Sequence, residues 1–232
     1  MRGPVLVSVF VLAVLTGCGS SPSRPAPAPR PAIQVSATLV SPNDITVRWK
    51  DPGRGVAGHI VEFATSPRGP YTILQFLPPR VATYTHPDLM PQTPFYYRVR
   101  PYYGPVSSSV DIALPRRPEG PKAARSVGAA ATYSIRGDGS GGIPTDLKGI
   151  VTAADTIRFT WTDHAGDEDG YLLEVRPAGR RDVEVVAALD PNVTLFDLVT
   201  LPEEKSASYR VRAFYYGTAS NIAHQRTRGT PD

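Results

Sequence analysis

Hydrophobic and polar residues alternate along several short stretches of the chain. Residues 45–49 read Ile-Thr-Val-Arg-Trp and residues 157–161 read Ile-Arg-Phe-Thr-Trp; the same alternation runs through 95–99 and 207–211. Alternation over about five residues is typical of β-strands that bury one face. Proline and glycine, at 25 and 20 residues, separate these stretches, and no helical period is sustained beyond the first twenty residues. The pattern predicts an all-β protein.

The chain contains the same pattern twice. Residues 49–103 align without a gap to residues 161–215 at an offset of 112, and fourteen of the fifty-five aligned pairs are identical. The pair Trp49/Trp161 is among them. A repeat of this length predicts two structural units of the same kind, each with its own core.

The repeat and the shifts in composition predict the domain organisation. We expect a signal peptide at 1–17, a lipidated cysteine and Pro/Ser-rich tether at 18–32, a first module at 33–115, a linker at 116–142, a second module at 143–228 and a short tail at 229–232. The linker is rich in Gly and Ala, so we expect little fixed geometry between the modules unless they share an interface. Its apolar stretch 127–135 could add a strand.

The first residues have the layout of a secretory signal. Arg2 precedes an apolar run from Val5 to Leu15, which is too short to span a membrane. Leu15-Thr16-Gly17-Cys18 then resembles the lipobox of bacterial lipoproteins. The resemblance implies cleavage after Gly17 and acylation of Cys18, with two or three chains giving a lasting anchor.

The residue after the cysteine bears on the destination of the protein. Gly19 stands where aspartate would retain a lipoprotein in the inner membrane. By resemblance to lipoproteins of two-membrane bacteria, we expect export and anchoring to the outer membrane.

Each half resembles a fibronectin type III domain. The residues that carry the resemblance are Trp161-Thr162-Asp163, Asp169-Gly170-Tyr171, and Leu201-Pro202 through the strand Tyr209-Arg210-Val211-Arg212, with their counterparts in the first half. The resemblance implies two immunoglobulin-like sandwiches of seven strands in tandem, with no cofactor and no disulfide. The place of the family's corner tyrosine holds Phe95 and Ala207, so Tyr97 and Tyr209 are expected to pack there instead.

The outward parity of two neighbouring strands predicts ion pairs. Glu62 should meet Arg98 or Arg100, and Glu174 should meet Arg210 or Arg212, as exposed cross-strand pairs worth about 0.2 to 1 kcal/mol each.

Composition excludes some functions. The net charge is +4, but its charges are interspersed, which argues against nucleic acid. No nucleophile-and-base motif, phosphate loop or zinc helix occurs, so we expect no enzyme. His59 falls on an inward parity and should pack in the core. The acidic loop 163–169 lacks the spacing of a calcium loop and is read as a solvated turn.

Two surface motifs remain. Tyr96, Arg98, Arg100 and Tyr102 form a predicted aromatic and basic stripe that could bind sugars or acidic polymers, although ordinary sheet-surface residues are the alternative. Arg136-Gly137-Asp138 spells an integrin-binding tripeptide, but it lies in the linker of a predicted bacterial lipoprotein, so integrin binding is not expected.

These features predict a membrane-anchored cell-envelope lipoprotein. We expect it to act as a non-catalytic binding or spacer scaffold, with another envelope protein or a surface polysaccharide as its partner. The alternative is a carbohydrate-binding accessory subunit of an envelope enzyme.

Overall fold

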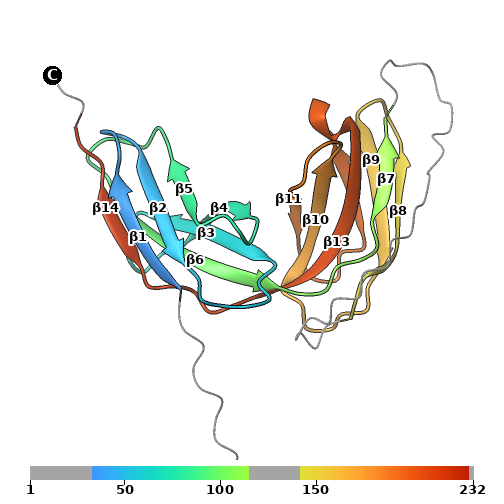
Figure 1. Cartoon of the computed structure of the whole chain (residues 1–232), viewed down its shortest axis with the longest axis horizontal. Coiled ribbons are helices and arrows are strands. Elements are labelled where there is room, and N and C mark those ends of the chain that lie inside the picture. The colour runs from blue at the N-terminus through green and yellow to red at the C-terminus, as the bar shows by residue number, and fades with distance from the viewer. Residues whose placement is uncertain (1–32, 115–141, 230–232) are drawn as a thin grey trace, which may run out of the picture. The chain divides into compact units, whose positions relative to one another are not determined.

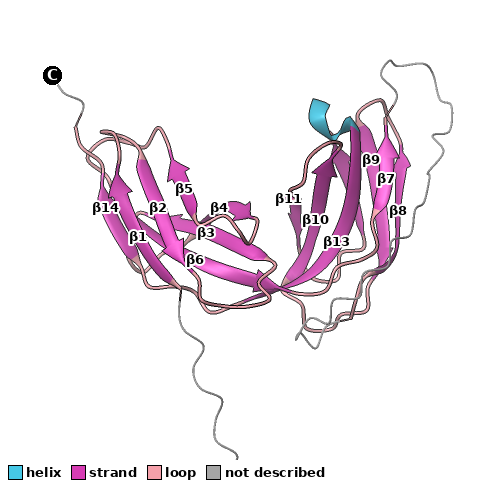
Figure 2. Cartoon of the chain, viewed as in Figure 1, coloured by secondary structure: helices cyan, strands magenta, loops and turns pink. Residues whose placement is uncertain are grey.

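A computed structural model describes residues 33–114 and 142–229 of the chain (Figure 1). The described residues form fourteen β-strands and one short 3₁₀ helix, coloured by type in Figure 2. The predicted all-β class is therefore confirmed.

The first sandwich, sandwich 1, packs a three-stranded sheet on a four-stranded one. The three-stranded sheet has the order β1-β2-β5, and the other has the order β4-β3-β6-β14. The strand bounds are β1 Gln34–Leu39, β2 Ile45–Lys50, β3 Gly58–Ala64, β4 Thr72–Leu77, β5 Thr83–His86, β6 Pro94–Tyr103 and β14 Ala223–Arg226. Its core includes Trp49, Tyr97 and, from the last strand, Ala223.

Sandwich 2 repeats this arrangement. One sheet has the order β12-β9-β8, and the other has the order β11-β10-β13-β7. The strand bounds are β7 Val110–Ala113, β8 Thr145–Val151, β9 Thr156–Thr162, β10 Gly170–Pro177, β11 Glu184–Leu189, β12 Leu195–Val199 and β13 Ser206–Tyr216, with the 3₁₀ helix η1 at Pro202–Lys205. Its core includes Trp161 and Tyr209, together with Ile112 and Leu114 from the first half of the chain.

The two halves of the chain exchange their last strands. β7 directly follows β6 in sequence, yet it pairs with β13 of sandwich 2. β14 follows β13, yet it pairs with β6 of sandwich 1. Each of the predicted modules, 33–115 and 143–228, thus contributes one strand to the other sandwich.

The exchange changes the role of the predicted linker. The described strands on either side of it, β7 and β8, both belong to sandwich 2. The chain instead passes between the sandwiches twice, after β6 and after β13, where Tyr215 and Tyr216 also pair with Tyr103 and Tyr102. All strands of sandwich 2 therefore lie between β6 and β14 of sandwich 1, as an insertion. The described residues thus join the sandwiches through these two crossings, and residues 116–141 of the predicted linker lie outside the described residues.

Side chains select the exchanged pairing. A Cβ atom added at Gly149 of β8 would lie 2.2 Å from Cδ1 of Ile112, so the isoleucine side chain would have to shift if this residue were not glycine. The repeat equivalent of Gly149 is Ala37, whose methyl group would occupy that space in sandwich 1. The space that Ile112 uses in sandwich 2 is therefore smaller at the equivalent position of sandwich 1.

The first strand of sandwich 1 is held by an asparagine side chain that precedes the exchanged strand β14. The side-chain amide of Asn221, just before β14, accepts a hydrogen bond from the Val35 amide at 2.8 Å and donates one to the Val35 carbonyl at 3.0 Å. Its equivalent before β7, by the register of that strand on β13, is Ser108, whose side chain is shorter and presents one hydroxyl in place of a separate amide oxygen and nitrogen.

The corners before strands β6 and β13, where the family's corner tyrosine would lie, are held differently in the two sandwiches. The Tyr209 hydroxyl donates to the Glu204 carbonyl at 2.7 Å, so it forms the tie to the backbone that was expected to be missing. Tyr97 meets Nδ1 of His86 at 3.2 Å instead. The prediction that Tyr209 only packs is thus corrected for sandwich 2.

The first prediction tests the exchange directly. In a chain carrying Cys18→Ser, we expect Asp111→Cys and Ser208→Cys to form a disulfide, because these residues are cross-strand partners in β7 and β13. After cleavage at a protease site engineered into residues 116–141, the two fragments should run as one band on a non-reducing gel.

A matched pair provides the control. Tyr96 is the equivalent of Ser208 on β6, so Asp111→Cys with Tyr96→Cys would form a disulfide only if β7 folded back on its own half. A disulfide in that variant, or two separate bands in the first, contradicts the exchange.

The second prediction concerns Gly149. We expect Gly149→Ala to destabilise the wild-type chain because of the clash with Ile112, and to be neutral or stabilising beside Ile112→Val, which removes the clashing carbon. The coupling in a double-mutant cycle of denaturant unfolding should be about 0.5 to 3 kcal/mol. Additive effects would show that the two residues do not touch.

Candidate functional site

The predicted stripe lies on one face of β6, but its residues differ in exposure. Tyr96, Arg98 and Arg100 are half-buried, whereas Tyr102 is only 3% exposed. Tyr102 packs with Ile60 and with two residues of sandwich 2, Leu172 and Phe214. Burial also raises the pKa of its hydroxyl above the usual range. Tyr102 therefore does not belong to an exposed stripe, because the strand crossing covers it.

Tyr96 is partly covered by the exchanged strand. The ring of His224 in β14 lies 4.7 Å from the Tyr96 ring, centroid to centroid, with the two planes inclined by 30°. The exchange thus supplies an aromatic neighbour that the sequence order does not suggest.

The two arginines of the stripe surround Glu62. Nε of Arg98 donates to the Glu62 carboxylate at 2.5 Å, and Nε of Arg100 lies 3.8 Å from the same oxygen. The guanidinium of Arg98 lies over the Tyr71 ring at 4.1 Å, and that of Arg100 lies over the Tyr216 ring at 5.0 Å. Both arginines are therefore already engaged by a carboxylate and by a ring.

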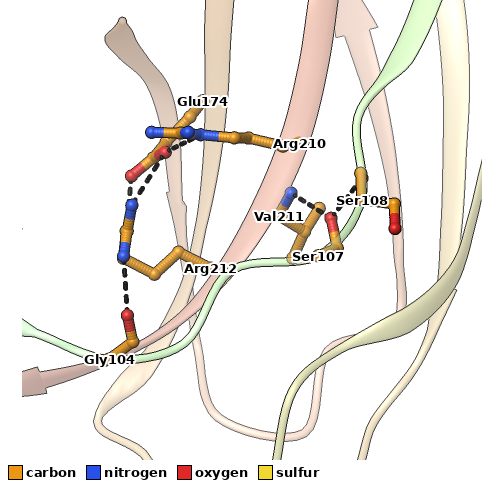
Figure 3. Close-up of polar contacts among 7 residues, drawn as sticks. All are labelled: Gly104, Ser107, Ser108, Glu174, Arg210, Val211 and Arg212. Atoms are coloured by element: carbon orange, nitrogen blue, oxygen red, sulfur yellow. Dashed lines mark hydrogen bonds and ion pairs between the residues drawn. The ribbon is translucent and has the colours of Figure 1, made fainter. Parts of the chain in front are cut away.

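The equivalent cluster in sandwich 2 is centred on Glu174 (Figure 3). Glu174 accepts hydrogen bonds from Nε of Arg210 at 2.5 Å and from Nε of Arg212 at 2.6 Å. Nη1 of Arg212 also donates to the Gly104 carbonyl at 2.6 Å. Gly104 lies where the chain leaves β6, so this cluster ties the first crossing to sandwich 2.

Both predicted ion pairs are confirmed, but their predicted exposure is wrong. The side chain of Glu174 is 2% exposed and that of Glu62 is 7% exposed. In such surroundings, an unpaired charge is costly, so the clusters fix strand register and crossing more strongly than surface pairs would.

Any residue other than glycine at position 104 would require the neighbouring backbone to shift. Its φ of 130° is strained for residues with a Cβ atom, and an added Cβ would lie 1.9 Å from the Ala213 carbonyl oxygen. The chain can thus leave β6 close against β13 only with glycine at this position.

The histidine predicted to be in the core is buried there. His59 is 3% exposed, lies 5.7 Å from the Trp49 ring, and holds an Asp51 carboxylate oxygen 2.8 Å from Nε2. In sandwich 2 the hydroxyl of Tyr171 donates to Asp163 at the equivalent place. Burial and this bond raise the pKa of Tyr171. Both pairs brace the loop after the tryptophan strand.

The carboxylates of the acidic loop have partners in the protein. Asp167 accepts from the Tyr215 hydroxyl at 3.3 Å, Glu168 from the Asn192 amide at 3.0 Å, and Asp169 from the Tyr216 amide at 2.7 Å. Burial, with Asp167 nearby, raises the pKa of Tyr215 to about 12. The loop thus holds the end of β13.

No group of three or more potential metal ligands occurs within 33–114 and 142–229. In the same two ranges there is no helix with the length and apolarity needed to cross a membrane. Cys18, Arg136-Gly137-Asp138 and the stretch 127–135 lie outside the described residues.

Comparison with known proteins yields structural neighbours only. No protein-family model matches the chain, and no curated protein matches it. A two-domain fibronectin type III segment of chicken tenascin aligns at 13% identity over 84% of this chain and 98% of its own, with a TM-score of 0.29. The chicken CNTN1 FN1–FN3 domains align at 18% identity over 85% of this chain and 67% of theirs, also with a TM-score of 0.29. The two-sandwich assignment therefore rests on the strand pairing described above.

The residues that sequence reasoning missed are those of the crossings. Asn221, Ser107 and Ser220 are ordinary polar residues near turns, and nothing in their immediate neighbourhood indicates which edge they bind. The one available signal is the comparison of repeat equivalents, in which Gly149 stands opposite Ala37 and Asn221 opposite Ser108.

The third prediction compares the two buried carboxylates. We expect Glu174→Gln to destabilise the chain by about 3 to 5 kcal/mol and Glu62→Gln by less. The reason is that Arg212 beside Glu174 is only 10% exposed, whereas Arg98 and Arg100 are 26% and 24% exposed. Denaturant unfolding measures both. Equal losses would mean that the burial of the arginines does not set the cost.

Proposed function

We propose that the chain is a lipid-anchored scaffold of the cell envelope that binds or spaces another envelope component without catalysis. The observation that carries the proposal is the lipobox Leu15-Thr16-Gly17-Cys18 directly after an apolar run of signal-peptide length. Two acyl chains or more on Cys18 would give a stable anchor, since one chain binds only marginally.

The architecture is compatible with this role. Both the first described strand, β1, and the last, β14, belong to sandwich 1. The predicted tether leads directly into β1, so sandwich 1 is the anchored module, and sandwich 2 is an insertion carried by it. Two crossings, rather than one linker, connect the carried module to the anchored one, which suits a spacer.

The described surface favours a scaffold over the carbohydrate-binding alternative. A sugar platform needs exposed rings. Tyr102 is buried, Tyr96 is covered on one side by His224, and both arginines of the stripe are engaged with Glu62. The partner we favour is therefore another envelope protein.

The fourth prediction tests the anchor. In bacterial cells supplied with labelled palmitate, the wild-type chain should incorporate the label and sediment with the envelope, and Cys18→Ala should lose both properties because it lacks the thiol that is acylated. Ser20→Ala is the matched control, since it changes a neighbouring residue and leaves the lipobox intact. A labelled Cys18→Ala chain would contradict the anchor.

The scaffold role is tested separately. Purified chain should capture an envelope protein from detergent-solubilised membranes and show no turnover of ester, peptide or glycoside substrates. Enrichment of glycan alone, lost in Tyr96→Ala, would favour the carbohydrate-binding alternative.

A further inference from the structure

Each exchanged strand is preceded by a serine that makes the same contacts on the other half. The Ser107 hydroxyl accepts a hydrogen bond from the Val211 amide at 3.0 Å and donates to the Ser108 carbonyl at 2.8 Å (Figure 3). The Ser220 hydroxyl accepts from the Val99 amide at 2.9 Å and donates to the Asn221 carbonyl at 2.6 Å. Val99 and Val211 are repeat equivalents, so the two contacts are copies of one another.

The strands that follow pair in the same register. Val110 of β7 lies opposite Tyr209, and Ala223 of β14 lies opposite the equivalent Tyr97. The buried cluster around the crossing repeats this correspondence, because it contains the equivalent pairs Ile60/Leu172 and Tyr102/Phe214. Each half of the chain thus offers a strand and an acceptor edge, and each is complemented by the other half.

The two halves contact one another without a covalent bond among the described residues. Residues 33–114 form the N-terminal half, residues 142–229 form the C-terminal half, and the chain between them is 115–141. None of the contacts that pair the halves requires them to belong to the same molecule.

We propose that the surface buried between the halves is also an interface for a second copy of this chain. The N-terminal half of one copy pairs with the C-terminal half of the other, and the reverse, so that both acceptor edges of each copy are filled. The product is a closed, two-fold symmetric dimer of two complete two-sandwich units.

Two side-chain contacts favour pairing between an N-terminal half and a C-terminal half over pairing between two identical halves. Ile112 needs the space above Gly149, which Ala37 fills in the N-terminal half. Val35 needs the amide of Asn221, which Ser108 replaces in the N-terminal half. Because two N-terminal halves would lack both fits, the N-terminal half of each copy pairs with a C-terminal half, and the reciprocal pairing of two copies leaves no acceptor edge unfilled.

Protein concentration decides between the two arrangements. Two segments of one chain are held at a high effective concentration relative to one another, which we take as about 1 mM. Chains refolded at about 1 mM should therefore form comparable amounts of monomer and dimer, while in chains refolded at about 1 µM the ratio of dimer to monomer should be about a thousand-fold lower.

The experiment uses the full chain with Cys18→Ser and two differently tagged variants. One carries Asp111→Cys in β7 and the other Ser208→Cys in β13. The two are mixed, unfolded, refolded together over a range of concentrations, and oxidised. We expect a disulfide-linked heterodimer on non-reducing gels, at a yield that rises with concentration, and a dimer mass by light scattering.

A second pair of variants distinguishes specific pairing from random thiol oxidation. Arg48 and Thr83 are cross-strand partners within the N-terminal half, in β2 and β5. Arg48→Cys on one chain and Thr83→Cys on the other should yield no disulfide, because these strands are not exchanged. If the Asp111→Cys and Ser208→Cys chains give no more heterodimer than this control, while the two substitutions in one chain form their disulfide, the proposal is overturned.

Discussion

The reciprocal pairing of β7 with β13 and of β14 with β6 is the constraint on which the rest of the structure depends. Each sandwich reaches seven strands only with a strand from the other half of the chain. Ile112 and Ala223 complete cores that are otherwise built by the other half. Since neither core is complete without the other half, the two repeats are not independent folding units.

The buried clusters at Glu62 and Glu174 follow from this constraint. Their outward parity would normally leave them in water, but the crossings bring Tyr216 over Arg100 and the Gly104 carbonyl against Arg212. In a sandwich without the crossing, these ion pairs would lie on the surface. The crossing covers them, while their residues and strand register stay the same. The cluster then favours the exchanged arrangement, because withdrawing the crossing would leave Arg212 without its carbonyl partner.

The local pattern of hydrophobic and polar residues predicted much of the fold. It did not predict how the chain connects the strands of the two sandwiches. Alternation placed Trp49 and Trp161 in equivalent cores, and outward parity placed Glu174 beside Arg210 and Arg212, because both properties depend only on neighbouring strands. The destination of β7 depends on small differences between two nearly identical acceptor edges. Those differences, a glycine against an alanine and an amide against a hydroxyl, become visible only when the repeats are compared as competing sites. The burial of Tyr102 was missed for the same reason.

The order of the strands along the chain differs from their grouping in the fold, because sandwich 2 is inserted between two strands of sandwich 1. All seven strands of sandwich 2 lie within one continuous stretch, from Val110 to Tyr216, in a circularly permuted order that begins with its last strand. Sandwich 1 closes only with Ala223–Arg226. A chain shortened from its carboxyl end would therefore open sandwich 1, which contains the first described strand β1, and leave sandwich 2 with all its strands.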